Sequence, residues 1–188
     1  MSTLNIVGLC GSLRKASFNH AALHLAGELM PSTMKLDIVD WRDTPVFDGD
    51  VLAQGLPPAV ARLRERIACA DGVLVATPEY NFSIPGGLKN VIDWMSRGDD
   101  QPFANKPVAI LSASPGPLGG ARMQYDLRKV MLYLNAAPLV KPEVFISGAG
   151  AKFDAQGRCI DETTRKFVGD QMLAFEQWIA AVGRMRAG

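Results

Sequence analysis

Short hydrophobic runs alternate with longer amphipathic stretches along most of the chain. The short runs predict strands at 4–10, 34–39, 72–77, 107–114 and 138–146. Apolar positions three and four residues apart predict helices at 18–30, from 57–58 to about 70, at 88–95, from the 115–120 loop through 134, and around 167–182. A polar loop is expected through Asp50. Pro142 interrupts the last predicted strand, which indicates an edge or a kink, because proline has no N–H to give to a sheet.

Strands that alternate with helices predict parallel β-α-β units, with helices on both faces of one sheet. In such sheets ligands bind beyond the carboxyl ends of the strands, near the point where the strand order reverses. We therefore expect the ligand-binding residues in the loops after the first, third and fourth strands.

The composition is that of a folded chain with little excess charge. Its 188 residues are 48% hydrophobic and 21% charged, and the net charge is +1. This excludes a disordered chain and gives no support to a nucleic-acid binder or to an acidic carrier that docks by charge. We expect one domain spanning residues 1–188.

Cysteine usage and hydropathy bear on the compartment. The three cysteines are odd in number and far apart, as expected of reduced thiols in a cytoplasm: Cys10, Cys69 and Cys159. The N-terminus lacks the long apolar stretch behind basic residues that a signal peptide needs. No apolar run reaches the ~18 residues of a membrane helix, so no membrane association is expected.

Two polar helical faces are expected to be solvated. The first consists of His20, His24 and Glu28. Two histidines without a convincing third ligand are weak evidence for a metal, so no metal site is expected. The second face consists of Arg62, Arg64, Glu65 and Arg66.

The loop after the first strand, GSLRKASFN, leads from a strand into a helix. A helix N-terminus offers unpaired N–H groups to an anion. Ser12, Ser17 and Asn19 add neutral donors, and Arg14 adds a charge-assisted contact. Together these residues suit a terminal phosphate monoester, although a solvated helix cap would use the same residue types.

Three rival phosphate motifs do not fit this loop. It lacks the Lys-Ser/Thr pair of a P-loop and the third glycine of a dinucleotide fingerprint. Cys10 and Arg14 suggest a cysteine phosphatase, but three residues separate them where such loops hold five. We expect Cys10 to be an inward-facing strand residue.

The loop after the third strand is the most informative stretch of the chain. Pro78 and Pro85 stiffen it and leave the backbone amides of 79–81 free to face a ligand. Such a rim suits a planar ring rich in heteroatoms, because backbone groups can meet the polar edge while apolar walls cover a face. The alternative is a stiff turn in which Tyr80 and Phe82 simply pack.

Taken together, GSLRKASFN and the later PEYNFSIPGGLKNVIDW resemble the NADPH-dependent FMN reductase family of flavodoxin-like proteins, within its quinone and chromate reductase branch. The resemblance covers essentially the whole chain. It implies an α/β fold, a doubly wound five-stranded parallel sheet of order 2-1-3-4-5 with helices on both faces, and noncovalently bound FMN. By this resemblance the cofactor-binding residues are Ser12, Arg14, Ser17, Phe18 and Asn19 around the phosphate, Pro78, Glu79, Tyr80 and Asn81 along the ring, and Ser114 and Gly116 on the other side.

The resemblance also implies a reaction. Hydride passes from NADPH or NADH to FMN, and a small-molecule acceptor then takes the electrons in a ping-pong cycle. Quinones are the expected acceptors, with chromate, azo compounds or free flavin as further ones. No catalytic side chain is required, and the helix start at Gly119 and Gly120 is expected to stabilise negative charge on the flavin.

The family resemblance further implies a homodimer or homotetramer. Arg122, Tyr125 and Glu143 are candidates for an intersubunit network, or simply for polar surface residues. Two other functions stay open: a flavodoxin-like electron carrier that docks on protein partners, and a phosphatase or phosphate-binding module built on the first loop alone.

Overall fold

The computed structural model describes residues 3–187. The extreme ends of the expected domain, residues 1–2 and 188, lie outside the described residues. A parallel sheet of order β2-β1-β3-β4-β5 forms its centre, and a short strand β6 also pairs with β4. The strands are β1 (Leu4–Cys10), β2 (Met34–Val39), β3 (Gly72–Ala76), β4 (Pro107–Ala113), β5 (Ala137–Pro138) and β6 (Val144–Ile146). The expected strand order is thus confirmed.

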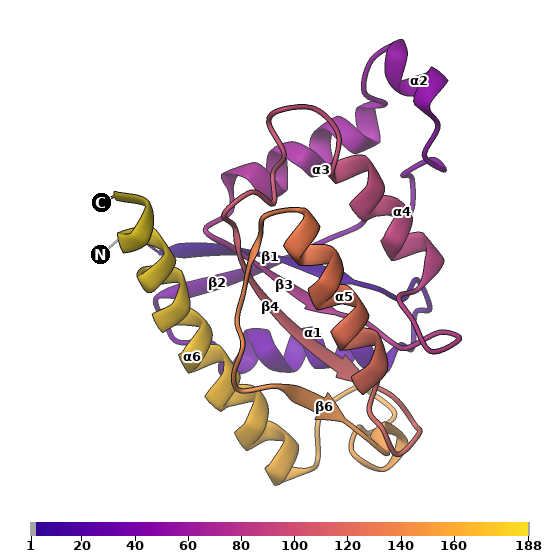
Figure 1. The fold of residues 1–188 in the computed structure, drawn as a ribbon. Helices are drawn as coiled ribbons and strands as arrows, with labels where there is room; N and C mark the ends of the chain where they lie inside the picture. The colour runs from indigo at the N-terminus through magenta and orange to yellow at the C-terminus, as the bar shows by residue number, and fades with distance from the viewer. Residues whose placement is uncertain (1–2, 188) are drawn as a thin grey trace.

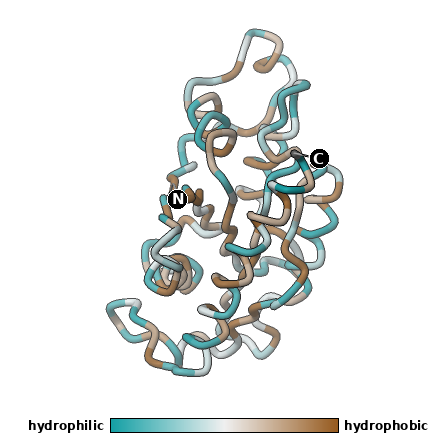
Figure 2. Tube along the Cα trace, turned by 90° about the vertical axis from the view of Figure 1, so that its left-hand side faces the viewer, coloured by the Kyte–Doolittle hydropathy of each residue, from teal (hydrophilic) through white to brown (hydrophobic). Residues whose placement is uncertain are grey.

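Helices cover both faces of this sheet (Figure 1). One face packs against α1 (Phe18–Leu29) and α6 (Glu162–Ala187). The other packs against α3 (Pro58–Cys69), α4 (Gly86–Met95) and α5 (Ala121–Tyr133). In β1 the side chains alternate between the two layers, so that Ile6 joins the first core and Val7 the second. In Figure 2 hydrophobic and hydrophilic residues alternate along the helices, as expected for helices that cover a sheet.

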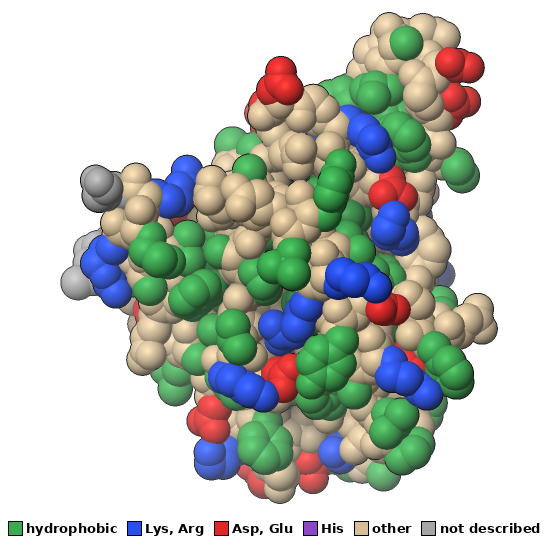
Figure 3. All heavy atoms as spheres, viewed as in Figure 1, with side chains coloured by type: hydrophobic (Ala, Val, Ile, Leu, Met, Phe, Trp, Pro, Cys, Tyr) green, Lys and Arg blue, Asp and Glu red, His purple; other side chains and the backbone are tan. Residues whose placement is uncertain are grey.

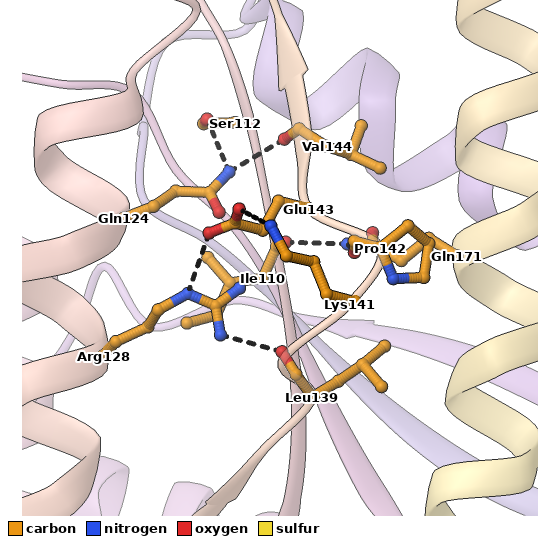
Figure 4. A network of polar contacts seen from close by, with 10 residues as sticks. All are labelled: Ile110, Ser112, Gln124, Arg128, Leu139, Lys141, Pro142, Glu143, Val144 and Gln171. Atoms are coloured by element: carbon orange, nitrogen blue, oxygen red, sulfur yellow. Dashed lines mark hydrogen bonds and ion pairs between the residues drawn. The ribbon is translucent and has the colours of Figure 1, made fainter.

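The fifth strand is broken in two, as Pro142 predicts. Its two parts, β5 and β6, both pair with β4, and the segment between them leaves the ladder. Two buried glutamines bridge the gap (Figure 4). Gln171 of α6 donates to the carbonyls of Ile110 and Pro142, each at 3.0 Å. Gln124 of α5 donates to the Val144 carbonyl and to the Ser112 hydroxyl, each at 2.8 Å.

Two expectations about polar segments were wrong. The stretch after β2 contains a short helix, α2 (Gly49–Ala53), capped by the Asp48 side chain, where a loop was expected through Asp50. Arg64 is not on a solvated face of α3: it is buried and donates to the carbonyls of Trp94 and Met95 at the end of α4. Its second nitrogen bonds the Asp100 carboxylate at 2.7 Å. A guanidinium can be buried here because carbonyl and carboxylate oxygens satisfy it.

The loops that follow the strands gather at one edge of the sheet. The arrowheads of β4 and β6 point to the lower right of Figure 1, toward the loops that lead to α5 and to the 3₁₀ turn Ala149–Ala151. Strand order reverses between β1 and β3, so the switch point lies at this edge. Among residues 3–187, no helix has the length and hydrophobicity needed to cross a membrane.

Candidate active site

The loop between β1 and α1 presents an array of free backbone amides. From Leu13 to Phe18, the N–H groups of Arg14 and Ser17 have an acceptor, whereas those of Leu13, Lys15, Ala16 and Phe18 have none within residues 3–187. Ser17 is the N-cap of α1, and its hydroxyl accepts from the Asn19 N–H at 3.2 Å. Successive free N–H groups at a helix N-terminus make an anion-binding concavity.

The side chains of this loop divide into buried hydroxyls and an exposed cation. Ser12 and Ser17 are buried, at 9% and 5% exposure. Arg14 is exposed, makes no ion pair within the described residues, and lies with its guanidinium carbon 5.8 Å from the Phe18 ring centroid. An unpaired guanidinium beside free amides is well suited to a doubly charged phosphate.

The Asn19 side chain bonds the backbone of Ala113, a contact that the sequence did not predict. Its side chain is buried, its Nδ2 donates to the Ala113 carbonyl at 2.9 Å, and its Oδ1 accepts from the Ala113 N–H at 2.8 Å. Both ends of the amide are therefore used to fasten α1 to the end of β4. The side chain holds the anion-binding loop in place, and one of its two Nδ2 hydrogens is left without an acceptor within residues 3–187.

Cys10 is the last residue of β1 and is buried, as expected. Burial raises the pKa of its thiol, against smaller opposing contributions from hydrogen bonds to Ser12 and Ser17. A thiol held in the protonated form is a poor nucleophile. The cysteine-phosphatase reading of this loop therefore finds no support.

The loops after β1 and β3 are in contact. A Cβ atom on Gly11 would lie 1.9 Å from the Thr77 hydroxyl oxygen, so only glycine fits where the two chains leave the sheet. Thr77 is itself completely buried. This contact brings the GSLRKASFN and PEYN segments together at the switch point.

The PEYN segment forms a tight hairpin. Tyr80 and Ser83 exchange two backbone hydrogen bonds of 3.0 Å, and the two residues between them, Asn81 and Phe82, have φ of 50° and 68°. The N–H of Tyr80 is thus used within the hairpin and is not free for a ligand, contrary to expectation. Those of Glu79 and Asn81 have no acceptor within residues 3–187. Pro78 precedes them directly.

The Glu79 side chain turns toward α5. Its carboxylate accepts from Arg122 Nε and Nη2, each at 2.8 Å, and from the Met123 N–H at 3.4 Å. The amide at the start of α5 is therefore occupied by the chain's own carboxylate. Ala121 N–H likewise donates to the Leu118 carbonyl at 3.1 Å. The N–H groups of Gly119 and Gly120 have no acceptor within residues 3–187, so the suggested role of this helix start toward a flavin stays a prediction.

The loop after β4 lies at the same end of the sheet as the loops after β1 and β3. The Ser114 hydroxyl accepts from the Gly116 N–H at 3.1 Å, which closes a turn directly after β4. The Ser114 carbonyl accepts from Ala149, and the Gly116 carbonyl from Gly148. Ser114 and Gly116 are thus fixed by the segment that follows β6, a link the sequence did not reveal.

The intersubunit network suggested for Arg122, Tyr125 and Glu143 stays a prediction, and within one chain two of these residues have other ionic partners. Arg122 binds Glu79 instead. Glu143 pairs with Lys141, whose ammonium holds the pKa of that carboxyl below its usual range, with smaller contributions from Arg128 and Tyr125.

The two histidines of α1, His20 and His24, contact each other edge to face, with ring centroids 4.6 Å apart. No group of three or more metal-ligating side chains occurs among residues 3–187.

Comparison with known proteins agrees with this geometry. The family described as NADPH-dependent FMN reductase matches residues 4–151. The chain is 49% identical over 176 residues to "NAD(P)H-dependent FMN reductase PA1204" of Pseudomonas aeruginosa, covering 94% of this chain and 95% of that protein. It is 44% identical over 182 residues to a "Quinone reductase" of Escherichia coli K12, covering 95% and 97%.

Solved structures lead to the same family. FerB, a "flavoenzyme NAD(P)H:(acceptor) oxidoreductase" from Paracoccus denitrificans, superposes with a TM-score of 0.88 at 34% identity, covering 95% of this chain and 98% of FerB. The fold is thus flavodoxin-like, as its strand order indicates. The chain belongs to the NADPH-dependent FMN reductase family.

Proposed function

We propose that the protein is an FMN-dependent NAD(P)H oxidoreductase that reduces quinones. The observation that carries the proposal is the set of free amides and the unpaired Arg14 at the start of α1, in contact with the PEYN hairpin at the switch point. A phosphate and a planar ring are the two ends of FMN. Relatives named for FMN reduction and quinone reduction, at 49% and 44% identity, support the same activity.

The residues present fit an FMN phosphate. The free amides of Leu13, Lys15, Ala16 and Phe18 and the Ser12 and Ser17 hydroxyls would surround it, and Arg14 would pair with its charge. Phe18 would border it from the first turn of α1. Asn19 would act indirectly, by holding this turn against Ala113.

The isoalloxazine ring would lie along the second and third loops. The free N–H groups of Glu79 and Asn81 are donors for its polar edge, and Pro78 and Tyr80 supply carbon surface beside them. Ser114 and Gly116 would border the opposite side, held there by the segment after β6. No side chain is assigned a catalytic role.

Bound FMN accepts hydride from a nicotinamide and delivers electrons to a second molecule. The protein's part is to bind, to orient and to provide one open site. Within the described residues, everything after Ala151 is a loop and the helix α6, which packs on the sheet. Donor and acceptor would therefore use the same site in turn.

The proposed function also covers electron acceptors other than quinones. An open rim with exposed Tyr80 suits planar acceptors, so we include azo compounds and free flavin with quinones, and chromate as a small inorganic oxidant. A protein partner is not required. The alternative, an electron carrier that docks on proteins, is distinguished by turnover with a small quinone alone.

We further propose a homodimer or homotetramer of a single FMN-binding domain spanning residues 1–188, working in the cytoplasm with its cysteines reduced. All three cysteines are free. The face formed by α5 and α6 carries hydrophobic side chains among basic ones (Figure 3). Three side chains of α5, Tyr125, Leu132 and Tyr133, and Val140 between β5 and β6 are 58–75% exposed. Light scattering on the purified protein tests the assembly.

The visible absorbance spectrum of the purified protein tests the cofactor assignment, and Arg14→Ala tests the phosphate site. We expect a flavin spectrum, and a dissociation constant for FMN raised about tenfold or more by Arg14→Ala, the scale of one charge-assisted bond. Arg62→Ala, an exposed arginine on α3, is the matched control and should bind FMN normally. A colourless protein that does not bind added FMN, or an Arg14→Ala variant with unchanged affinity, would contradict the assignment.

A further inference from the structure

A long groove runs along α1, between this helix and the loop that follows the 3₁₀ turn. Its volume is about 970 Å³, whereas the groove between β2 and α3 measures about 370 Å³. One wall follows α1 from Ser17 to Glu28, over which a helix advances about 16 Å. The other wall is formed by Gly150 and residues 153–158, the orange segment after β6 in Figure 1. The groove is much larger than a single phosphate and falls within the range of small-molecule sites.

The groove begins inside the proposed phosphate site. Arg14, Ser17 and Phe18 line it, and the same three residues are expected around the phosphate. Among the described residues, neither 78–83 nor 114–116, which would border the flavin ring, contributes to its lining. The groove therefore continues from the phosphate end of a bound FMN and not from its ring.

The end of the groove nearest the phosphate site carries the free positive charge. Arg14 and Lys15 are both exposed there, and neither forms an ion pair within residues 3–187. Farther along, Asp154 already pairs with Arg158 at 2.8 Å, and the Glu28 carboxylate lies 3.5 Å from a guanidinium nitrogen of α6. Two free cations side by side suit two linked phosphates better than one.

Aromatic rings line the middle of the groove. The exposed His24 contacts His20 edge to face, and the Phe18 and Phe153 ring centroids lie 6.1 Å apart. Burial, with a smaller contribution from His24, lowers the pKa of His20, so that this ring is uncharged at neutral pH. Imidazole and phenyl rings are surfaces on which a purine base stacks.

The outer wall of the groove is a well-defined turn. The Asp154 carboxylate accepts from the N–H groups of Gln156 and Arg158, each at 2.9 Å. Gly157, with φ of 79°, brings the turn against α1, where an added Cβ would lie 3.6 Å from the Ala21 side chain. These contacts form the groove within the chain itself, so a ligand would not have to order it on binding.

We propose that this groove holds the adenosine monophosphate half of FAD, so that the protein takes FAD as well as FMN. The inference rests on the proposed function, since the FMN half of FAD would occupy the site described above. NAD(P)H contains the same adenosine phosphate chemistry, but continuity with the phosphate end favours FAD, in which the second phosphate is bonded directly to the first. Lys15 would pair with that second phosphate, and His24 would stack on the adenine.

Competition between the two flavins tests this inference. The purified protein is dialysed against FMN and FAD at equal concentrations, and the bound flavins are then released and quantified by chromatography. We expect the wild type to bind FAD with an affinity within about tenfold of that for FMN. Lys15→Ala should lower the ratio of bound FAD to bound FMN about fivefold, and His24→Ala about tenfold.

Two further variants serve as controls for this ratio. His24→Phe keeps an aromatic ring on the groove and should restore the ratio lost in His24→Ala. Lys35→Ala removes an exposed lysine of β2 that does not line the groove, and should leave the ratio unchanged. Because both flavins share the phosphate and ring sites, a general loss of flavin affinity would not by itself alter the ratio.

Exclusion of FAD by the wild type, or an unchanged ratio in either Lys15→Ala or His24→Ala, would overturn the inference. A raised KM for NADPH in these variants with an unchanged ratio would also overturn it, and would place the adenosine of the donor in the groove instead. Failure of the proposed function would differ: the wild type itself would bind neither flavin and would reduce no quinone.

Discussion

At the scale of single residues, the same side-chain type serves different purposes in different surroundings. Ser17 and Asn19 both suit a phosphate by type, but the Asn19 amide exchanges two hydrogen bonds with the Ala113 backbone. Glu79 likewise lies in the ring-binding motif while its carboxylate binds Arg122. These partners are 94 and 43 residues away in the chain, so no local pattern could have revealed them.

Asn19→Ala should destabilise the protein without removing a direct ligand of FMN. The change leaves the buried N–H and C=O of Ala113 without partners, which costs about 2–4 kcal/mol of unfolding free energy. Urea denaturation of the FMN-free protein measures this loss. His24→Ala, on the exposed side of the same helix, should be nearly neutral. Equal stability of the Asn19→Ala variant and the wild type would show that the amide is not needed for the tether.

At the scale of elements, hydrophobic periodicity predicted the strands and the helices that pack on them, because burial itself produces these patterns. Pro142 correctly indicated a break in the last strand. The pattern did not predict α2, whose five residues include none that is buried. Nor did it identify Arg64, whose partners at the end of α4 come into reach only when α3 and α4 pack together.

The hydrogen bonds of Gln171 at the gap between β5 and β6 should contribute to stability. Gln171→Met should fill similar volume but leave the carbonyls of Ile110 and Pro142 unpaired at the gap between β5 and β6. We expect a loss of about 1–3 kcal/mol of unfolding free energy, measured in urea. Gln177→Met, at an exposed position of the same helix, should change stability by less than about 0.5 kcal/mol. A neutral Gln171→Met would mean that water or a small rearrangement satisfies both carbonyls.

At the scale of the whole molecule, the net charge of +1 does not indicate where the functionally important charged side chains lie. An unpaired Arg14 stands beside free amides at one end of the switch point, and a paired Arg122 supports an aromatic ring at the other. The first suits the phosphate of a bound ligand. The sequence predicted the location of this site through its two motifs, whereas the supporting contacts from α5 and β4 required the folded chain.

On the proposed function, this protein alone passes electrons from NAD(P)H to a small quinone. The most direct measurement follows NADPH or NADH oxidation by the purified FMN-bound protein with 1,4-benzoquinone and no other protein. We expect sustained turnover in which one quinone, with one further proton, is reduced to hydroquinone for each NAD(P)H oxidised. Absence of turnover with the quinone alone, and its appearance only when a protein acceptor is added, would instead identify an electron carrier that docks on protein partners.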